Sequence, residues 1–383
     1  MKLANEPIFH RAKLAQHFVE YIQSPDSSSG LFLAAPRRTG KTTFIKEDLI
    51  PLLRENGATV IYADLWEDKA VNPSVVIINA IRQAILETDG LVMKAAKSAG
   101  LVKFKVGGFE MDLGKIGAKD GDSISRTLKN FAAITKRPII MLIDEAQHAQ
   151  TTEAGRQTLF SLKAARDAMK SGSGPGFRML ATGSNSNKLA LLVSSKDQAF
   201  YMAPMEDLEQ LGADYLQWVL QTSTFRCKPS LAALVTGFDR CSHRPEPLKS
   251  VLRELAKSPT LEPDEIDSRF LDLMARNLQS ARDSFIQGLH GMEPLDAAVL
   301  QRMALTGKDF TPFDASALAH YSQLLQTSGA TEKTLPTQSS VQSSLERLRK
   351  EGLVWNAGRG IWLIEDAQHI GWINDAMVSA SAD

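Results

Sequence analysis

The sequence has little cysteine, no net charge and no long apolar run. Its 383 residues include two cysteines, Cys227 and Cys241, which are too few for a disulfide framework and lack the paired spacing of a zinc site. Lysine plus arginine number 44, as do aspartate plus glutamate. Because positive and negative charges balance over the whole molecule, any electrostatic contact with nucleic acid or membrane must come from a local patch of charged residues.

Neither a signal peptide nor a membrane span is visible in the sequence. The first fifteen residues mix charged side chains with short apolar stretches, and the most apolar run, 139–143, is about the length of a strand. A helix that crosses a bilayer needs ~20 apolar residues. With few cysteines as well, we expect a soluble, cytoplasmic protein that makes no membrane contact. An apolar fraction of 43% gives the chain material for two or three domains.

Short apolar runs alternate with helical patterns in the first half of the chain. The runs have the length and composition of buried parallel strands, and they are 31–35, 58–65, 138–144 and 177–182. The helical patterns between them are 73–87, 124–135 and 153–170. This alternation predicts an α/β fold, with a doubly wound parallel sheet and crossover helices on both faces.

Three domains are expected from the way this pattern changes along the chain. The core would cover 1–205, with a β-hairpin inserted near 101–119, where a glycine pair separates two stretches of period 2. Helical patterns dominate 206–290 and predict a small helical lid subdomain. A third unit would occupy 291–383.

The strand at 31–35 leads directly into a glycine-lysine loop and then a helix, which is the context of a P-loop. In such a loop, backbone N–H groups and the positive end of the following helix bind phosphate. We expect Lys41 to reach the β- and γ-phosphates of ATP, and the Thr42 hydroxyl to ligate Mg²⁺. Ala35 replaces the usual first glycine, and alanine is the mildest replacement. The other candidate nucleotide-binding residues are Pro36, Arg37, Arg38, Thr39, Gly40 and Thr43.

The apolar run at 139–143 ends in Asp144 and Glu145. A buried strand would deliver both acids to its carboxyl end, where open α/β sheets bind ligands. Asp144 would hold magnesium through its water shell, and Glu145 would orient and polarise the attacking water. Acids in this position also suit a helix N-cap and first turn, and both roles can hold at once.

A polar segment, Gly183-Ser184-Asn185, follows the strand at 177–182. A side chain here could lie between the two motifs and sense the γ-phosphate, with Ser184 and Asn185 as candidates. The alternative is a plain turn, because glycine, serine and asparagine are common turn residues.

Together these motifs resemble the archaeal-type AAA+ ATPases, which are related to origin-recognition-like ATPases. The resemblance spans about 9–255 and rests on Ala35–Thr43, Ile143–Gln147 and Thr182–Ser184. Pro7–Arg11 is also similar to the Phe-x-x-Arg segment that precedes the first helix in that family, although its Phe-to-Arg spacing is one residue shorter.

The resemblance implies a lid that carries a sensor arginine close to the nucleotide, and Arg244 occupies that place. An exposed arginine in front of a helix that starts at proline is the alternative. The resemblance further implies ATP hydrolysis, and we expect a homo-oligomer in the ATP state.

The C-terminal unit resembles a winged helix-turn-helix. Its patterns predict helices at 295–305, 314–325 and 337–350, followed by a hairpin with a basic tip at 356–360. In that arrangement the third helix enters the major groove of DNA and the wing touches phosphates or the minor groove. The candidate phosphate contacts are Arg347, Lys350 and Arg359, and the candidate base contacts are Gln338, Ser339 and Gln342.

The leading hypothesis is thus an ATPase that acts as a nucleotide-dependent switch on double-stranded DNA. Many winged helices bind protein instead, so the alternative is a nucleotide-regulated signalling or defence protein whose C-terminal domain binds a protein partner. A helicase is disfavoured, because the sequence after Met205 predicts helices and a winged helix and not a second sheet.

Overall fold

In a computed structural model, the chain forms two compact units, Met1–Gln210 and Leu211–Asp383. The structure describes residues 7–25, 27, 30–68, 70–88, 103–106, 109–117, 123–170, 175–223, 228–257, 262–327, 336–358 and 360–380. The expected division into three domains at 205 and 290 stays a prediction.

Unit 1 is built on a five-stranded parallel sheet with the strand order β2-β5-β6-β1-β7. The strands are β1 (Leu31–Ala34), β2 (Thr59–Asp64), β5 (Ile139–Asp144), β6 (Phe177–Gly183) and β7 (Met205–Asp207). The first four match the predicted apolar runs. β7 was not predicted, because this edge strand has three residues and two of them are acidic.

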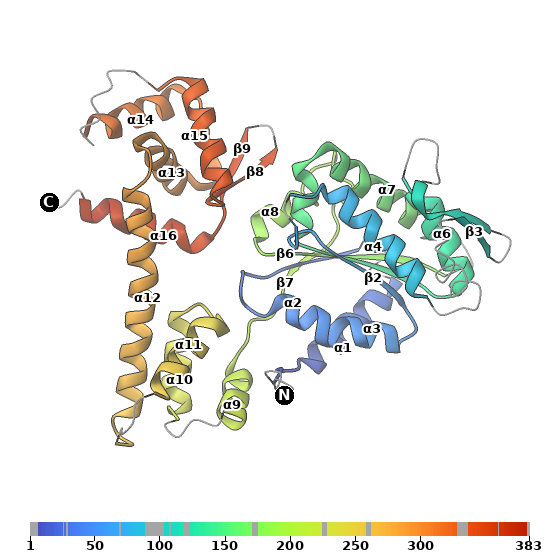
Figure 1. The fold of residues 1–383 in the computed structure, drawn as a ribbon, viewed down its shortest axis with the longest axis horizontal. Coiled ribbons are helices and arrows are strands. Elements are labelled where there is room, and N and C mark those ends of the chain that lie inside the picture. The colour runs from blue at the N-terminus through green and yellow to red at the C-terminus, as the bar shows by residue number, and fades with distance from the viewer. Residues whose placement is uncertain are drawn as a thin grey trace. The chain divides into compact units, whose positions relative to one another are not determined.

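Helices cover both faces of this sheet (Figure 1). One layer contains α1 (Ala12–Gln23), α2 (Lys41–Phe44) and α3 (Ile50–Glu55), and the other contains α4 (Pro73–Glu87), α6 (Ile124–Thr135) and α7 (Glu153–Lys170). Short elements connect them: η3 (Leu113–Lys115), η4 (Ala146–Thr151) and α8 (Ser186–Ala190). The predicted hairpin is present as β3 (Lys103–Val106) and β4 (Phe109–Asp112), which pair antiparallel.

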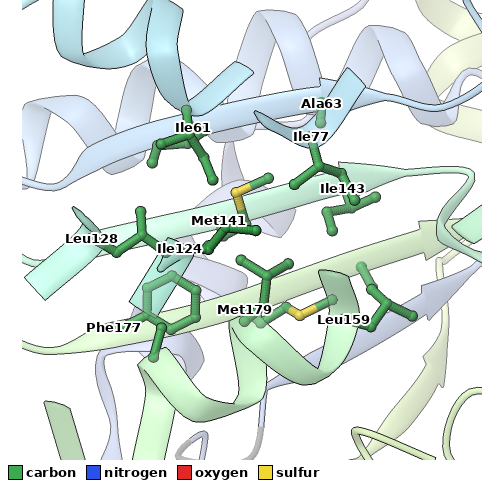
Figure 2. Close-up of a cluster of buried hydrophobic side chains, with 14 of the residues drawn as sticks. Ile61, Ala63, Ile77, Ile124, Leu128, Met141, Ile143, Leu159, Phe177 and Met179 are labelled. Carbon is green, nitrogen blue, oxygen red and sulfur yellow. The ribbon is translucent and has the colours of Figure 1, made fainter. Parts of the chain in front are cut away.

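Strand β5, which lies between β2 and β6, shows why the sheet is buried on both sides. Its alternate residues Met141 and Ile143 join the cluster under α4, α6 and α7, where Leu128 and Leu159 also pack (Figure 2). Ile140 and Leu142 join the opposite cluster, under α1, α2 and α3. Both clusters fix the strand, so its carboxyl end at Asp144 is held in a rigid frame.

The helix after the P-loop widens into a π-helical turn, η2 (Ile45–Leu49), just before Pro51. Proline has no N–H with which to continue the α-helical pattern, and single π-turns are frequent at functional sites. In this turn Asp48 accepts hydrogen bonds from the ring of His10 at 2.7 Å and from the backbone N–H of Arg11 at 3.0 Å. The N-terminal segment at 7–11 is thereby tied to the P-loop helix.

Unit 2 is helical and ends in a winged helix-turn-helix. Its first helices are α9 (Ala213–Thr222), α10 (Leu231–Arg240), α11 (Pro245–Leu255) and α12 (Ile266–His290). The winged helix consists of α13 (Pro294–Thr306), η5 (Gly307–Asp309), α14 (Ala315–Thr327), α15 (Gln338–Lys350), β8 (Val354–Gly358) and β9 (Ile361–Ile364). A last helix, α16 (Ala367–Ala380), was not predicted.

The winged helix encloses its own core. Val341, Leu345 and Leu348 form the buried face of α15 and pack with Trp362 of the hairpin. Thr337 caps α15 in a capping box with Ser340. Across the described residues, no helix combines the length and the apolar character that a membrane span requires.

Candidate nucleotide site

The loop between β1 and α2 contains two residues with a left-handed backbone, Arg38 (φ 63°) and Gly40 (φ 86°). Glycine adopts this conformation without strain, whereas for arginine it is costly. The Thr39 hydroxyl donates to the Pro36 carbonyl at 2.7 Å and closes the loop on itself. Left-handed residues in such loops turn backbone N–H groups toward a common centre that binds anions.

Lys41, the first residue of α2, lies between the two acids that end β5. Its Nζ is 2.6 Å from Asp144 Oδ1 and 2.5 Å from Glu145 Oε1, and the side chain is 6% exposed. The lysine charge is thus compensated by two buried carboxylates. Both halves of the predicted site meet here, although they are more than a hundred residues apart in the sequence.

Asp144 accepts hydrogen bonds on both of its carboxylate oxygens. Oδ2 accepts from the Thr42 hydroxyl at 2.9 Å. Oδ1 accepts from the Thr182 hydroxyl and from the Glu145 backbone N–H, in addition to Lys41. Asp144 is 1% exposed, so these donors fix the orientation of its carboxylate.

Tyr62, on the neighbouring strand β2, points its hydroxyl at the same carboxylate. The hydroxyl is 3.4 Å from Asp144 Oδ2 and 3.3 Å from Asp64 Oδ2. Burial and the charges of the two aspartates raise the pKa of Tyr62 far above its ordinary value. The phenol therefore stays protonated and available as a hydrogen-bond donor.

Glu145 has a left-handed backbone (φ 55°) and a fully engaged carboxylate. Its Oε2 accepts from the Gln147 amide at 2.6 Å, from the Ser184 hydroxyl at 2.7 Å and from the Ser184 backbone N–H at 3.2 Å. Burial alone would raise the pKa of Glu145. The charge of Lys41 and these hydrogen bonds outweigh burial and lower the pKa to about 2.

Of the two predicted sensor residues, Ser184 lies in the site and Asn185 lies beside it. The Ser184 hydroxyl donates to Glu145 and accepts from Arg37 Nε at 3.2 Å. Arg37 in turn lies over the ring of Trp66, 4.1 Å from its centroid. Asn185 accepts from the Lys188 backbone N–H at 3.1 Å and caps α8. Sensor roles for Ser184 and Asn185 both stay predictions.

The remaining predicted P-loop residues occupy the loop and the start of α2. Pro36, Arg38 and Thr43 are exposed, while Thr39 is buried. Their contact with nucleotide stays a prediction.

Two residues that were not predicted as site residues, Thr182 and Gln147, also contact the acids. The strand register contained a signal for Thr182: Ala181 pairs with Ile143, so the next residue of β6 lies beside Asp144. Gln147 had no such signal, because it reaches Glu145 only through the tight η4 turn.

In unit 2, Arg244 is engaged with the start of α16. Its guanidinium lies 3.3 Å from Asp366 and also donates to the Gln368 side chain. Arg244 precedes Pro245 at the first position of α11, as expected, but its side chain is only 15% exposed, so the alternative of an exposed arginine is wrong. A role for Arg244 as a nucleotide sensor stays a prediction.

The candidate DNA contacts lie on α15, and one of the cations there is neutralised. Arg347 binds Asp296 through two nitrogens, at 2.8 and 2.5 Å. Gln338, Ser339, Gln342 and Lys350 are exposed on the same helix. Arg359 lies outside the described residues.

Two solved structures share this fold over nearly the whole chain. A Walker-type ATPase of Pyrococcus abyssi is 16% identical, with a TM-score of 0.51 and 96% of each chain covered. The ORC2 protein of Aeropyrum pernix, in its ADP form, is 12% identical, with a TM-score of 0.54, covering 100% of this chain and 97% of its own. No protein-family model and no curated protein matches the sequence. The fold is that of AAA+ P-loop ATPases with a C-terminal winged helix.

Proposed function

We propose that this protein binds and hydrolyses ATP and that its nucleotide state controls how its winged helix engages double-stranded DNA. The observation that carries the ATPase part is the buried cluster in which Lys41 and Thr42 of the P-loop contact Asp144 and Glu145. The same fold in a Walker-type ATPase and in an ADP-form ORC2 protein supports this part.

ATP binding would redistribute the charge around Lys41. The β- and γ-phosphate oxygens attract the ammonium group that otherwise lies between the two carboxylates. Lys41 is the strongest influence that lowers the pKa of Glu145, so its departure raises that pKa. Glu145 then becomes a better proton acceptor for the attacking water. Substrate binding would thereby prepare the general base.

The oxygens of Thr42 and Asp144 suit a magnesium ion. They are 2.9 Å apart and belong to a hydroxyl and a carboxylate, which are the hard ligands that Mg²⁺ prefers. An ion held by Thr42 and Asp144 would supply positive charge to offset the negative charge that develops on the phosphates. The Asp144 carboxylate is fixed for this role, because its other oxygen, Oδ1, accepts hydrogen bonds from the Thr182 hydroxyl and the Glu145 N–H.

Two substitutions test the ATPase proposal. Lys41→Ala should abolish ATP binding in calorimetry, because it removes the ammonium group that would otherwise reach the β- and γ-phosphates and leaves Asp144 and Glu145 uncompensated at the site. Glu145→Gln should still bind ATP but release phosphate about 10²- to 10⁴-fold more slowly, the usual contribution of a general base. A parental hydrolysis rate in Glu145→Gln would show that the catalytic assignment is wrong.

The DNA part rests on the winged helix and on the exposed polar face of α15. Gln338, Ser339 and Gln342 offer hydrogen-bonding groups at the end of the helix that enters the groove in such folds. Lys350 adds one exposed cation. Binding to a DNA duplex should therefore be measurable for the full chain and lost in a version that ends near Gly291.

One observation favours the second candidate function, a signalling or defence protein whose C-terminal domain binds a protein partner. Arg347 is paired with Asp296 and Arg349 with Glu346, so α15 presents less free positive charge than its sequence suggests. DNA affinity depends on such cations and falls steeply with salt. Absence of duplex binding at 50 mM salt would favour the protein-binding function.

A further inference from the structure

The turn that follows β5 contains a buried amide, Gln147, that contacts the proposed catalytic base. Gln147 is 0% exposed, and its Nε2 donates to Glu145 Oε2 at 2.6 Å. We propose that Gln147 is a positioning residue for ATP hydrolysis, which holds the Glu145 carboxylate in place after Lys41 has turned to the phosphates. This inference rests on the proposed ATPase function.

The two oxygens of Glu145 are held in different ways. Oε1 accepts from Lys41, whereas Oε2 accepts from Gln147 and from the hydroxyl and backbone N–H of Ser184. If Lys41 leaves, Oε1 is released to take a proton from water, while Oε2 keeps its donors. The carboxylate then stays oriented at the moment when it must act as a base.

The backbone of Glu145 increases the need for such a support. Its left-handed conformation is uncommon for a residue with a long side chain, and it starts the short η4 turn. Gln147 lies on the same turn, so a single local structure sets both the base and the group that orients it.

Because Gly183 has no side chain, the Gln147 amide can pack against its backbone. A Cβ at position 183 would lie 2.7 Å from Gln147 Oε1, closer than real side chains approach. Among the described residues, Gln147 Oε1 has no hydrogen-bond partner. An unpaired buried oxygen lowers stability, so packing alone would favour leucine or methionine at this position. The hydrogen bond from its nitrogen to Glu145 is therefore what an amide contributes at this position.

The main test compares two glutamine substitutions on η4 in the full chain. Gln147→Met keeps the shape but removes the donor, and should lower kcat about 10- to 100-fold with little change in the Kd for ATP. Gln150→Met is the matched control: Gln150 is 5% exposed, and its amide donates to Gln198 at 2.9 Å and not to Glu145. It should leave kcat within about twofold of the parent.

A double substitution separates positioning from a general structural effect. If Gln147 acts through Glu145, Gln147→Met should add less than about twofold to the loss already caused by Glu145→Gln. Multiplicative losses would overturn the inference. Should Gln147→Met fail to fold, Gly183→Ala provides a second variant, because its methyl group displaces the amide. A parental kcat in a folded Gly183→Ala protein would also overturn the inference.

The outcomes distinguish this inference from the proposed function. A slow Glu145→Gln together with a parental kcat in Gln147→Met overturns the positioning role and leaves the ATPase intact. A parental rate in Glu145→Gln, or no phosphate release by the unaltered chain, overturns both. A slow Gln147→Met with a normal Gln150→Met and an unchanged Kd supports the positioning role.

Discussion

At the residue scale, the site is held by charge compensation around Lys41. One buried ammonium and two buried carboxylates would each be costly alone, and their mutual contacts at 2.5 and 2.6 Å make burial tolerable. The hydroxyls of Thr42, Thr182 and Ser184 donate further hydrogen bonds to these carboxylates. The site is therefore sensitive both to pH and to the loss of a single hydroxyl.

The acid stability of the protein should reflect Glu145. Its pKa is lowered from 4.5 to about 2 in the folded chain. A lowered carboxyl pKa stabilises the fold above the unfolded value, and that stabilisation is lost as the pH falls from about 4.5 to about 2. Urea unfolding at pH 5 and pH 2.5 should show a smaller loss of unfolding free energy in Glu145→Gln than in the parent. Equal losses would contradict the assignment.

Thr182→Val should weaken the site without changing its shape. The substitution removes the hydroxyl that donates to Asp144 and leaves a buried carboxylate one donor short. Hydrogen bonds to charged groups contribute about 1.5–3 kcal/mol, so the unfolding free energy should fall by about that amount. Urea denaturation measures this change. Thr222→Val, which removes an exposed hydroxyl bonded to a helix carbonyl, is the control and should have little effect.

At the element scale, the sequence predicted those parts whose burial is set by local pattern. β5 reads as continuous apolar residues because both faces are covered, and α15 shows its buried stripe and its Thr337 cap. α16 was missed because tertiary contacts define it: His369 stacks on Phe285 of α12 at 4.0 Å, and Trp372 packs against both rings. Likewise, no periodicity could reveal that Gln147 reaches Glu145 around a tight turn.

The start of α16 should depend on Arg244. Burial would raise the pKa of Asp366, but the Gln368 backbone N–H and the charge of Arg244 lower it, which shows a net favourable environment for the carboxylate. Arg244→Met should therefore speed amide hydrogen exchange in α16 of the full chain. Arg276→Met is the control, because Arg276 is 68% exposed and pairs with Asp272 on its own helix, where ion pairs contribute little. Unchanged exchange in Arg244→Met would refute the anchoring role.

At the scale of the whole molecule, the chain combines a P-loop-type parallel-sheet core with a winged helix in separate compact units. Sequence motifs predicted the candidate nucleotide site because P-loop chemistry fixes residue types at short spacing. The same motifs could not predict the charge that the winged helix presents on its surface. The partners of Arg347 and Arg349 on α15 depend on folding, and they reduce its positive charge.

We also expect ATP to promote self-association. Glu145→Gln, which should hold ATP without consuming it, ought to elute as a homo-oligomer with ATP and as a smaller species with ADP in light-scattering chromatography. Lys41→Ala should show the same mass under both conditions, because it should not bind either nucleotide. An ATP-independent mass for Glu145→Gln would contradict this expectation.

The affinity of the chain for a DNA duplex in different nucleotide states tests the nucleotide-controlled switch most directly. Fluorescence anisotropy at fixed low salt would compare Glu145→Gln with ATP and with ADP, and Lys41→Ala under both conditions. The switch predicts a difference of about tenfold or more, or ~1.4 kcal/mol, between the ATP and ADP states of Glu145→Gln and none for Lys41→Ala. Equal DNA affinity of Glu145→Gln in both states would contradict it.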